Sequence, residues 1–342
     1  MTEWSEILAM RLLEDKNIPA NIIINIYNMY KGKNYTIDEA IVKHPKTPDY
    51  IIKEIYYSYL NEYKNKEGDS FDLYLKLESI ERKITLNPNA SEDILTEIYY
   101  NNKNKTDTKI IEYIASNPKT PVYIIEELFK SGDSDILDSL AENPKAPVYI
   151  LEELFKSNEY CILYRLAGNP NIPINILIEI YKKADHAIKI KIAGNPRTPV
   201  DIIYKLYKIG DVDIIDKIAI NSSTPLDLLI EIYNKAKMYD KYDRNSIYIS
   251  LMKNPKLPEN IIREIYKSDP DYLEEYVAQA PNTPNDLLDE LAKVYSWYTK
   301  INVVRHPNTR LDTLLYLLYY DDDELVKDLA LVKLNIKCGR FV

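Results

Sequence analysis

The feature that most constrains the fold of this chain is a proline-containing motif that recurs along almost its whole length. Its commonest form is Asn-Pro-x-x-Pro, and its copies are spaced by 26 residues from 117 to 221 and again from 254 to 306. Of the 19 prolines, 18 belong to the motif and only Pro270 does not. The first residue of each copy is called the anchor here, and the anchors are Asp15, His44, Asn87, Asn117, Asn143, Asn169, Asn195, Asn221, Asn254, Ala280 and His306. A fixed period of this length indicates a stacked repeat architecture.

Each repeat is expected to form a pair of short helices. In the repeat that begins at Asn117, Thr120-Pro121 supplies a good N-cap and a good first helical residue, so a first helix is expected to about Lys130. A second helix is expected over residues 135–142, and Asn143-Pro144 ends it, because a residue before proline is disfavoured in the α conformation. Neither helix is long enough to be stable alone, so the repeats must stack.

A recurring apolar position supports this register. Eleven residues after each anchor the chain has Ile or Leu, at Ile26, Ile55, Ile98, Leu128, Leu154, Ile180, Leu206, Ile232, Ile265, Leu291 and Leu317. The next position is aromatic in nine of the eleven repeats. Alanine recurs two residues before the anchor, at Ala115, Ala141, Ala167, Ala193, Ala219 and Ala278, where a small side chain lets two backbones approach closely. We therefore expect one continuous core along a single solenoid.

The combination of Asn-Pro, Thr-Pro and a small residue in each repeat resembles the leucine-rich repeat variant family, and in style the HEAT and armadillo solenoids. The resemblance covers about residues 15–332. It implies an all-α, right-handed α-solenoid, here of about eleven short helix pairs. The 26-residue period is slightly longer than is usual in that family, so the second helix is expected to be a true α-helix. The iron–sulfur segment of one branch of the family has no counterpart, because a cysteine cluster is lacking.

The chain ends and two enlarged repeats depart from the regular pattern. The expected parts are an N-terminal capping helix over 1–14, the repeat array over 15–320, and a C-terminal capping helix with a tail over 321–342. The enlarged repeats are 44–86 and 221–253. In the first, both helices are expected to lengthen around a loop at 65–70, and the second gains a polar stretch at Lys235–Asn245. Insertions into repeat arrays commonly carry specific contacts, so these are candidate partner sites.

Composition excludes several classes of function. With only 7 glycines, the chain has no glycine-rich phosphate loop and no G-x-S-x-G nucleophile elbow, and it also lacks H-E-x-x-H. Cys161 and Cys338 belong to no C-x-x-C pair, so neither a metal nor another cofactor is predicted. The N-terminus is unlike a signal peptide, and no apolar stretch approaches the roughly 20 residues of a transmembrane helix. We therefore expect a cytoplasmic protein in a reducing compartment, without membrane contact.

Two rows of charged residues are candidate binding surfaces. Ten residues after the anchor, the first helices carry Glu54, Glu97, Glu127, Glu153, Glu179, Glu231, Glu264 and Glu290, interrupted by Lys205. We interpret this row as a solvated helix face, with an acidic face for a basic partner as the alternative. Four residues before the anchor, the second helices carry Tyr113, Ser139, Arg165, Lys191, Lys217, Ser250, Tyr276 and Asn302.

The second-helix row is the main candidate, because second helices often line the concave surface of α-solenoids. Its candidate binding residues are Tyr113, Arg165, Lys191, Lys217 and Tyr276. A second set, at the corners two residues after the anchor, consists of Lys119, Lys145, Arg197 and Lys256. Such a positive groove can hold an acidic peptide or a phosphate backbone, with the tyrosines stacking on bases.

The three histidines give no sign of a catalytic or metal site. His44 and His306 occupy the anchor position, where the imidazole is expected to replace the asparagine amide in a backbone hydrogen bond. His186 is expected in a turn beside Asp185, and no two histidines have ligand or triad spacing.

These observations predict a non-enzymatic scaffold or adaptor that binds a protein partner through its concave second-helix face and inserted loops. The alternative is binding of nucleic acid or a ribonucleoprotein through a central basic groove, although the net charge of −9 argues against bulk nonspecific binding. A third reading is an enzyme similar to the HEAT-like DNA glycosylases, which needs a strongly basic groove and a carboxylate beside aromatics. No catalytic residue can be assigned for it, and a small-molecule ligand is not expected.

Overall fold

The computed structural model describes residues 6–16, 18–65, 71–105 and 109–339, which form 23 α-helices and no β-strand. The helices pack in sequence-adjacent pairs, so the expected all-α, solenoid-like fold is confirmed. The chain divides into two units, Met1–Arg165 and Leu166–Arg340. No helix of the described residues is long and apolar enough to cross a membrane.

The first helix of each pair is called the A helix and carries an even number, and the second is called the B helix. The helices that begin in the N-terminal unit are α1 (Glu6–Glu14), α2 (Ala20–Tyr30), α3 (Tyr35–Lys43), α4 (Asp49–Asn65), α5 (Phe71–Thr85), α6 (Glu92–Asn102), α7 (Lys109–Ser116), α8 (Val122–Ser131), α9 (Ser134–Glu142), α10 (Val148–Ser157) and α11 (Tyr160–Gly168). The boundary between the units falls within α11 and not in a linker.

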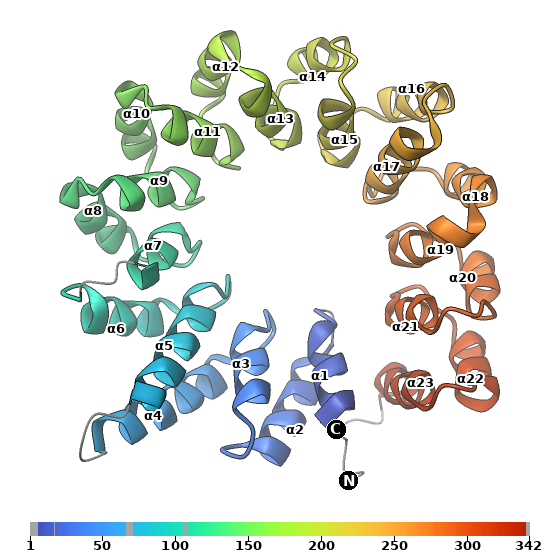
Figure 1. Cartoon of the computed structure of the whole chain (residues 1–342), viewed down its shortest axis with the longest axis horizontal. Coiled ribbons are helices and arrows are strands. Elements are labelled where there is room, and N and C mark those ends of the chain that lie inside the picture. Colours follow the sequence, from blue (N-terminus) through green and yellow to red (C-terminus); the bar gives the residue numbers. More distant parts are fainter. Residues whose placement is uncertain (1–5, 17, 66–70, 106–108, 340–342) are drawn as a thin grey trace. The chain divides into compact units, whose positions relative to one another are not determined.

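The C-terminal unit continues the same alternation. Its helices are α12 (Ile174–Lys183), α13 (His186–Gly194), α14 (Val200–Tyr207), α15 (Val212–Ile220), α16 (Leu226–Ala236), α17 (Lys241–Met252), α18 (Glu259–Ser268), α19 (Pro270–Gln279), α20 (Asn285–Leu291), α21 (Trp297–Arg305), α22 (Leu311–Tyr320) and α23 (Glu324–Lys337). Within each unit, most B helices pack directly on the B helix of the next repeat, from α3 to α9 and from α13 to α23, whereas the A helices pack mainly on B helices. Each unit therefore curves toward its B helices, which lie on the inner side (Figure 1).

The predicted core is confirmed. The eleven Ile or Leu residues that follow the anchors by eleven positions, called the ladder here, are all buried, with relative exposures of 3% or less. The six recurring alanines are buried as well. Burying a side chain of this size contributes roughly 1.5–3 kcal/mol relative to leaving it exposed. Because each ladder residue sits on an A helix and each alanine on a B helix, the core runs between the two rows of helices.

The anchor asparagines join successive repeats. Asn143 ends α9 in an extended conformation, and its Nδ2 donates to the carbonyls of Ala115 and Asn117 at 2.6 and 3.0 Å. Its Oδ1 accepts from the backbone N–H of Lys145 at 2.7 Å. Equivalent bonds are made by Asn87, Asn117, Asn195, Asn221 and Asn254. The acceptor two residues before the previous anchor is alanine in four of these repeats and Val42 or Thr85 in the other two, so the bond does not depend on the alanine side chain.

The role of the threonine differs from the predicted N-cap. Helix α8 begins at Val122, and Pro121 occupies its N-cap position with no side-chain hydrogen bond. Thr120 is buried and instead donates from Oγ1 to the carbonyl of Ile114 in the preceding helix, at 2.5 Å. The hydroxyl faces backward because the last carbonyls of a helix lack intrahelical partners, and a buried one must find a donor.

The enlarged repeats are mainly helical. The first lengthens α4 and α5 to 17 and 15 residues. Of the loop expected at 65–70, residue 65 ends α4 and residues 66–70 lie outside the described residues, as do residues 1–5 of the N-terminal cap and 340–342 of the C-terminal tail. The stretch Lys235–Asn245 was predicted as an inserted loop, but only residues 237–240 connect α16 to α17. The Asp240 carboxylate accepts from the backbone N–H of Asp243 at 3.0 Å, and this cap starts α17 early.

Candidate functional site

All five candidate residues of the second-helix row lie on B helices. Tyr113 and Arg165 lie on α7 and α11 in the N-terminal unit, and Lys191, Lys217 and Tyr276 lie on α13, α15 and α19 in the C-terminal unit. Of these, Lys191 and Lys217 are on helices that pack directly against each other. The row is therefore spread along the repeats and does not converge on one point.

The charge of Arg165 is neutralised within its own unit. Its Nε donates to Asp138 Oδ2 at 3.0 Å, and its Nη1 donates to Glu142 Oε2 at 2.7 Å. Both carboxylates belong to α9, the preceding B helix. The guanidinium of Arg82 lies over the aromatic ring of Tyr113 in a cation–π contact, 5.8 Å from the ring centroid. The N-terminal unit thus contributes a mixed surface at these positions and not a basic groove.

The two lysines of the C-terminal unit lie against the ends of helices. A Cβ atom at Gly168 would be 3.6 Å from Lys191 Cδ, and one at Gly194 would be 3.8 Å from Lys217 Cδ. Gly168 and Gly194 are the last residues of α11 and α13. The aliphatic stems therefore cover the C-terminal ends of the preceding B helices, where a positive charge is favoured by the helix dipole.

In the fold, each corner residue donates its backbone N–H to the anchor, whatever its side chain. The N–H of each is held by the anchor asparagine, as described for Lys145, and Asn171 and Ser223 occupy the same position in other repeats. Lys145 Nζ also pairs with Glu92 at 2.7 Å, and Lys256 Nζ donates to the Thr224 carbonyl at 3.2 Å. Lys119 and Arg197 are exposed.

The acidic row lies on the A helices, and most of its members have cationic or hydroxyl partners. Glu127 pairs with Lys103 at 3.1 Å and Glu179 with Lys182 at 2.6 Å. Tyr233 OH donates to Glu264 of the next repeat at 2.6 Å. These contacts favour the interpretation of the row as a solvated helix face.

The two anchor histidines replace asparagine as predicted. His306 Nε2 bonds to the Ala280 carbonyl at 2.9 Å, and its Nδ1 accepts from Asn308 N–H at 3.1 Å. His44 makes the same pair of contacts, to the Asp15 carbonyl and Lys46 N–H, both at 3.1 Å. This geometry requires the neutral ring with the proton on Nε2, and burial lowers the pKa of both histidines.

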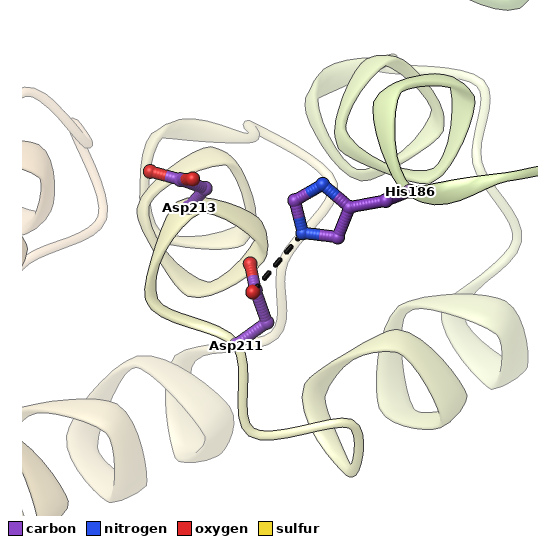
Figure 2. Close-up of side chains that lie close together, drawn as sticks. All are labelled: His186, Asp211 and Asp213. Carbon is purple, nitrogen blue, oxygen red and sulfur yellow. Dashed lines mark ion pairs between the residues drawn. The ribbon is translucent and has the colours of Figure 1, made fainter.

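His186 is brought together with two carboxylates, which the sequence pattern did not indicate. His186 is the first residue of α13, and Asp211 is the N-cap of α15. Figure 2 shows the imidazole directed at Asp211, with 3.0 Å between His186 Nε2 and Asp211 Oδ2. One ligand atom each from His186, Asp211 and Asp213 lies within 4.8 Å of the others, a donor set that a divalent transition metal accepts. Asp211 Oδ1 also accepts from Ile214 N–H at 3.0 Å and so caps α15. Together with the contact to His186, this bond gives Asp211 a structural role as a link between α13 and α15.

A pocket of about 410 Å³ lies at the enlarged repeat 221–253, between α16, α17 and α18. Its lining includes Tyr233, Lys237, Arg244, Tyr248, Glu264 and Lys267. The rings of the two tyrosines lie 5.6 Å apart, and Lys237 Nζ is 4.2 Å from the Tyr233 ring centroid and 3.8 Å from Glu264. The sequence placed Lys237 and Arg244 in the inserted stretch and Glu264 in the acidic row, but it did not bring them together, because Glu264 and Lys267 come from the following repeat.

Comparisons of the chain with protein-family models, with curated proteins and with solved structures found no match. The resemblance to the leucine-rich repeat variant family therefore stays a prediction that rests on the repeat pattern.

Proposed function

We propose that the chain is a non-enzymatic scaffold that binds a protein partner along its B helices and at the enlarged repeat 221–253. The observation that carries this proposal is the direct packing of successive B helices within each unit. The solvent-facing residues of the B helices form an extended, preformed surface on which many modest contacts can add up.

The charge pattern of this surface favours a protein over a polyanion. Helix α9 presents Asp135 together with Asp138 and Glu142, which share the single cation Arg165, whereas α13 presents Lys189 and Lys191. A nucleic acid needs a track of cations, and acidic positions along the track repel it. A protein partner can match charges of both signs, and it gains from tyrosine and arginine in the surface.

Binding of nucleic acid or a ribonucleoprotein is the second candidate. Lys191 and Lys217 favour it, because they lie on adjacent B helices in the C-terminal unit. Such binding would weaken steeply with salt, since it releases counterions from the phosphates.

The test uses two variants with the same change of charge. Lys191→Glu with Lys217→Glu alters the B-helix surface, and Lys156→Glu with Lys182→Glu alters exposed positions on the A helices α10 and α12. The tagged full-length chain is used to capture partners from the source cells, with and without nuclease. The proposal expects one set of proteins, insensitive to nuclease, that the A-helix variant retains and the B-helix variant loses. Equal capture by both variants would contradict it, and nuclease-sensitive capture would favour the second candidate.

A further inference from the structure

We propose that the pocket between α16, α17 and α18, called the insertion pocket here, binds an acidic peptide segment of the partner. In this assignment Arg244 and Lys267 hold a carboxylate of the segment, and Met238 and Tyr242 contact an apolar side chain beside it. The inference rests on the proposed scaffold function and names the chemistry of one of its contacts.

The charges around the insertion pocket leave an excess of cations. Lys237, Arg244 and Lys267 line the pocket together with one carboxylate, Glu264. Glu264 Oε2 already accepts from Tyr233 OH at 2.6 Å and lies 3.8 Å from Lys237 Nζ. Lys267 makes no hydrogen bond or ion pair within the described part of the chain. A carboxylate placed in the pocket would therefore meet two cations that Glu264 does not neutralise.

The neighbouring carboxylate, Asp269, is occupied by other donors. Its Oδ2 accepts from Lys241 Nζ at 2.8 Å and from Asn245 Nδ2 at 2.9 Å. These two bonds hold the pKa of Asp269 below its usual value, with a smaller contribution from the charge of Arg244. Asp269 thus stays ionised, but it makes no hydrogen bond with Arg244.

Arg244 has an unused donor at this place. Its Nε atom is buried and has no hydrogen-bond partner among the described residues. A buried N–H without an acceptor costs free energy. Because Nε is closed to solvent, a carboxylate in the pocket would bond the terminal Nη atoms instead, and its two oxygens match the forked geometry of the guanidinium.

Two large apolar side chains near the start of α17 are almost fully exposed. Met238, in the loop between α16 and α17, is 87% exposed, and Tyr242, in the first turn of α17, is 82% exposed. Methionine and tyrosine are both favoured at protein interfaces. The combination of a cationic pocket and apolar neighbours fits a segment in which acidic and apolar residues alternate.

The surroundings disfavour a nucleic acid at this place. The A helices of this unit expose Glu231, Glu264 and Glu290, and the whole chain carries −9. The three cations converge on one pocket instead of following a row, so they fit one anionic group and not a backbone of regularly spaced phosphates.

The test measures fluorescence anisotropy with the full-length chain and three labelled probes. The first probe is a short peptide in which Asp and Glu alternate with Leu and Phe, and the second replaces its acids with Asn and Gln. The third is a single-stranded oligonucleotide. We expect the acidic peptide to bind. The amide peptide should bind at least about tenfold more weakly, because charge-assisted hydrogen bonds are lost.

Variants assign the binding to the insertion pocket. Arg244→Gln with Lys267→Gln is expected to weaken the acidic peptide at least tenfold, and Lys267→Gln alone, at an exposed position, gives a smaller loss in the same direction. Met238→Ser with Tyr242→Ser should weaken both peptides. The matched control, Lys156→Gln with Lys182→Gln, should leave affinity within about twofold, since exposed pairs contribute little. Circular dichroism checks that each variant is folded.

Several results would overturn the assignment. These are no binding of the acidic peptide, equal binding of the amide peptide, or unchanged affinity in the Lys267→Gln variant. Stronger binding of the oligonucleotide that the same pocket variants abolish would make the pocket a phosphate site instead. If the peptide fails while captured partners still depend on Lys191 and Lys217, only this inference fails and the scaffold function stands.

Discussion

The hydrogen bonds of the anchor asparagines lead to a testable prediction about how the repeats are held together. In Asn221, Nδ2 donates to the carbonyls of Ala193 and Asn195 at 2.7 and 2.9 Å, and Oδ1 accepts from Ser223 N–H at 2.8 Å. Asn221→Ala removes all three bonds at a position that is only 3% exposed.

The expected loss follows from these bonds. Each typical hydrogen bond contributes a net of about 0.5–1.5 kcal/mol, and buried groups left without a partner cost more. The Asn195 carbonyl keeps a second donor, Thr198 N–H at 3.0 Å, so it is not stranded. We therefore expect Asn221→Ala to lower the free energy of unfolding by about 2–4 kcal/mol. That is a large share of the roughly 5–15 kcal/mol that keeps a typical protein folded.

Two measurements check this prediction. Denaturant unfolding gives the loss of stability, and hydrogen exchange with mass spectrometry should place the loss of protection in α13 to α16, since each repeat contacts only its neighbours. Ser222→Ala, at the exposed adjacent position, is the control and should change stability by less than about 0.5 kcal/mol. A loss below about 1 kcal/mol in Asn221→Ala, or a uniform loss of protection, would refute the role of the amide as a link between repeats.

Three further predictions concern the anchors and one buried acid. Ala280→Asn should stabilise the chain by about 1–2 kcal/mol in denaturant unfolding, because it supplies the amide that this repeat lacks; no gain would show that the local spacing differs. His44→Asn with His306→Asn should flatten the pH dependence of the unfolding midpoint. Burial lowers the pKa of both histidines in the folded state, so stability is full above about pH 6.5 and falls as the pH drops from there through the lowered values; an unchanged profile would contradict this. Burial raises the pKa of Asp38 to about 6, so Asp38→Asn should stabilise the chain by about 1–3 kcal/mol at neutral pH, with the gain shrinking below about pH 6; a loss at neutral pH in the same unfolding assay would count against it.

The core of this fold was predictable because burial leaves a periodic trace in the sequence. Ile180 and Leu206 occur at equal distances from their anchors, and both are completely buried. Proline marks the helix ends equally well, since its effect on the preceding residue is local. What the sequence could not supply is the direction of a polar side chain between repeats. Asn143 reaches a carbonyl 28 residues earlier, and Thr120 turns backward to Ile114, because the distances between stacked backbones decide both contacts.

The neutralisation of Arg165 had a signal in the sequence that the row analysis missed. Asp138 and Glu142 lie 27 and 23 residues before it, close to one repeat period. Side chains on the same face of two successive B helices are therefore neighbours, and charges must be compared across repeats as well as along one row. The insertion pocket needed the structure, because it depends on where α17 begins, and Asp240 decides that through its cap.

The same contacts separate the candidate residues that the fold explains from those it does not. Arg165 and Lys145 are held by carboxylates of their own unit, so their charge already serves the packing of the repeats. Lys119 and Arg197 contribute only a backbone N–H to the corner, which Asn171 supplies equally well. Their side chains make no hydrogen bond or ion pair within the described residues. Substituting either side chain should therefore leave stability unchanged, so that a change in binding can be attributed to a partner contact. Lys119 and Arg197 are for this reason the most informative corner positions for binding assays.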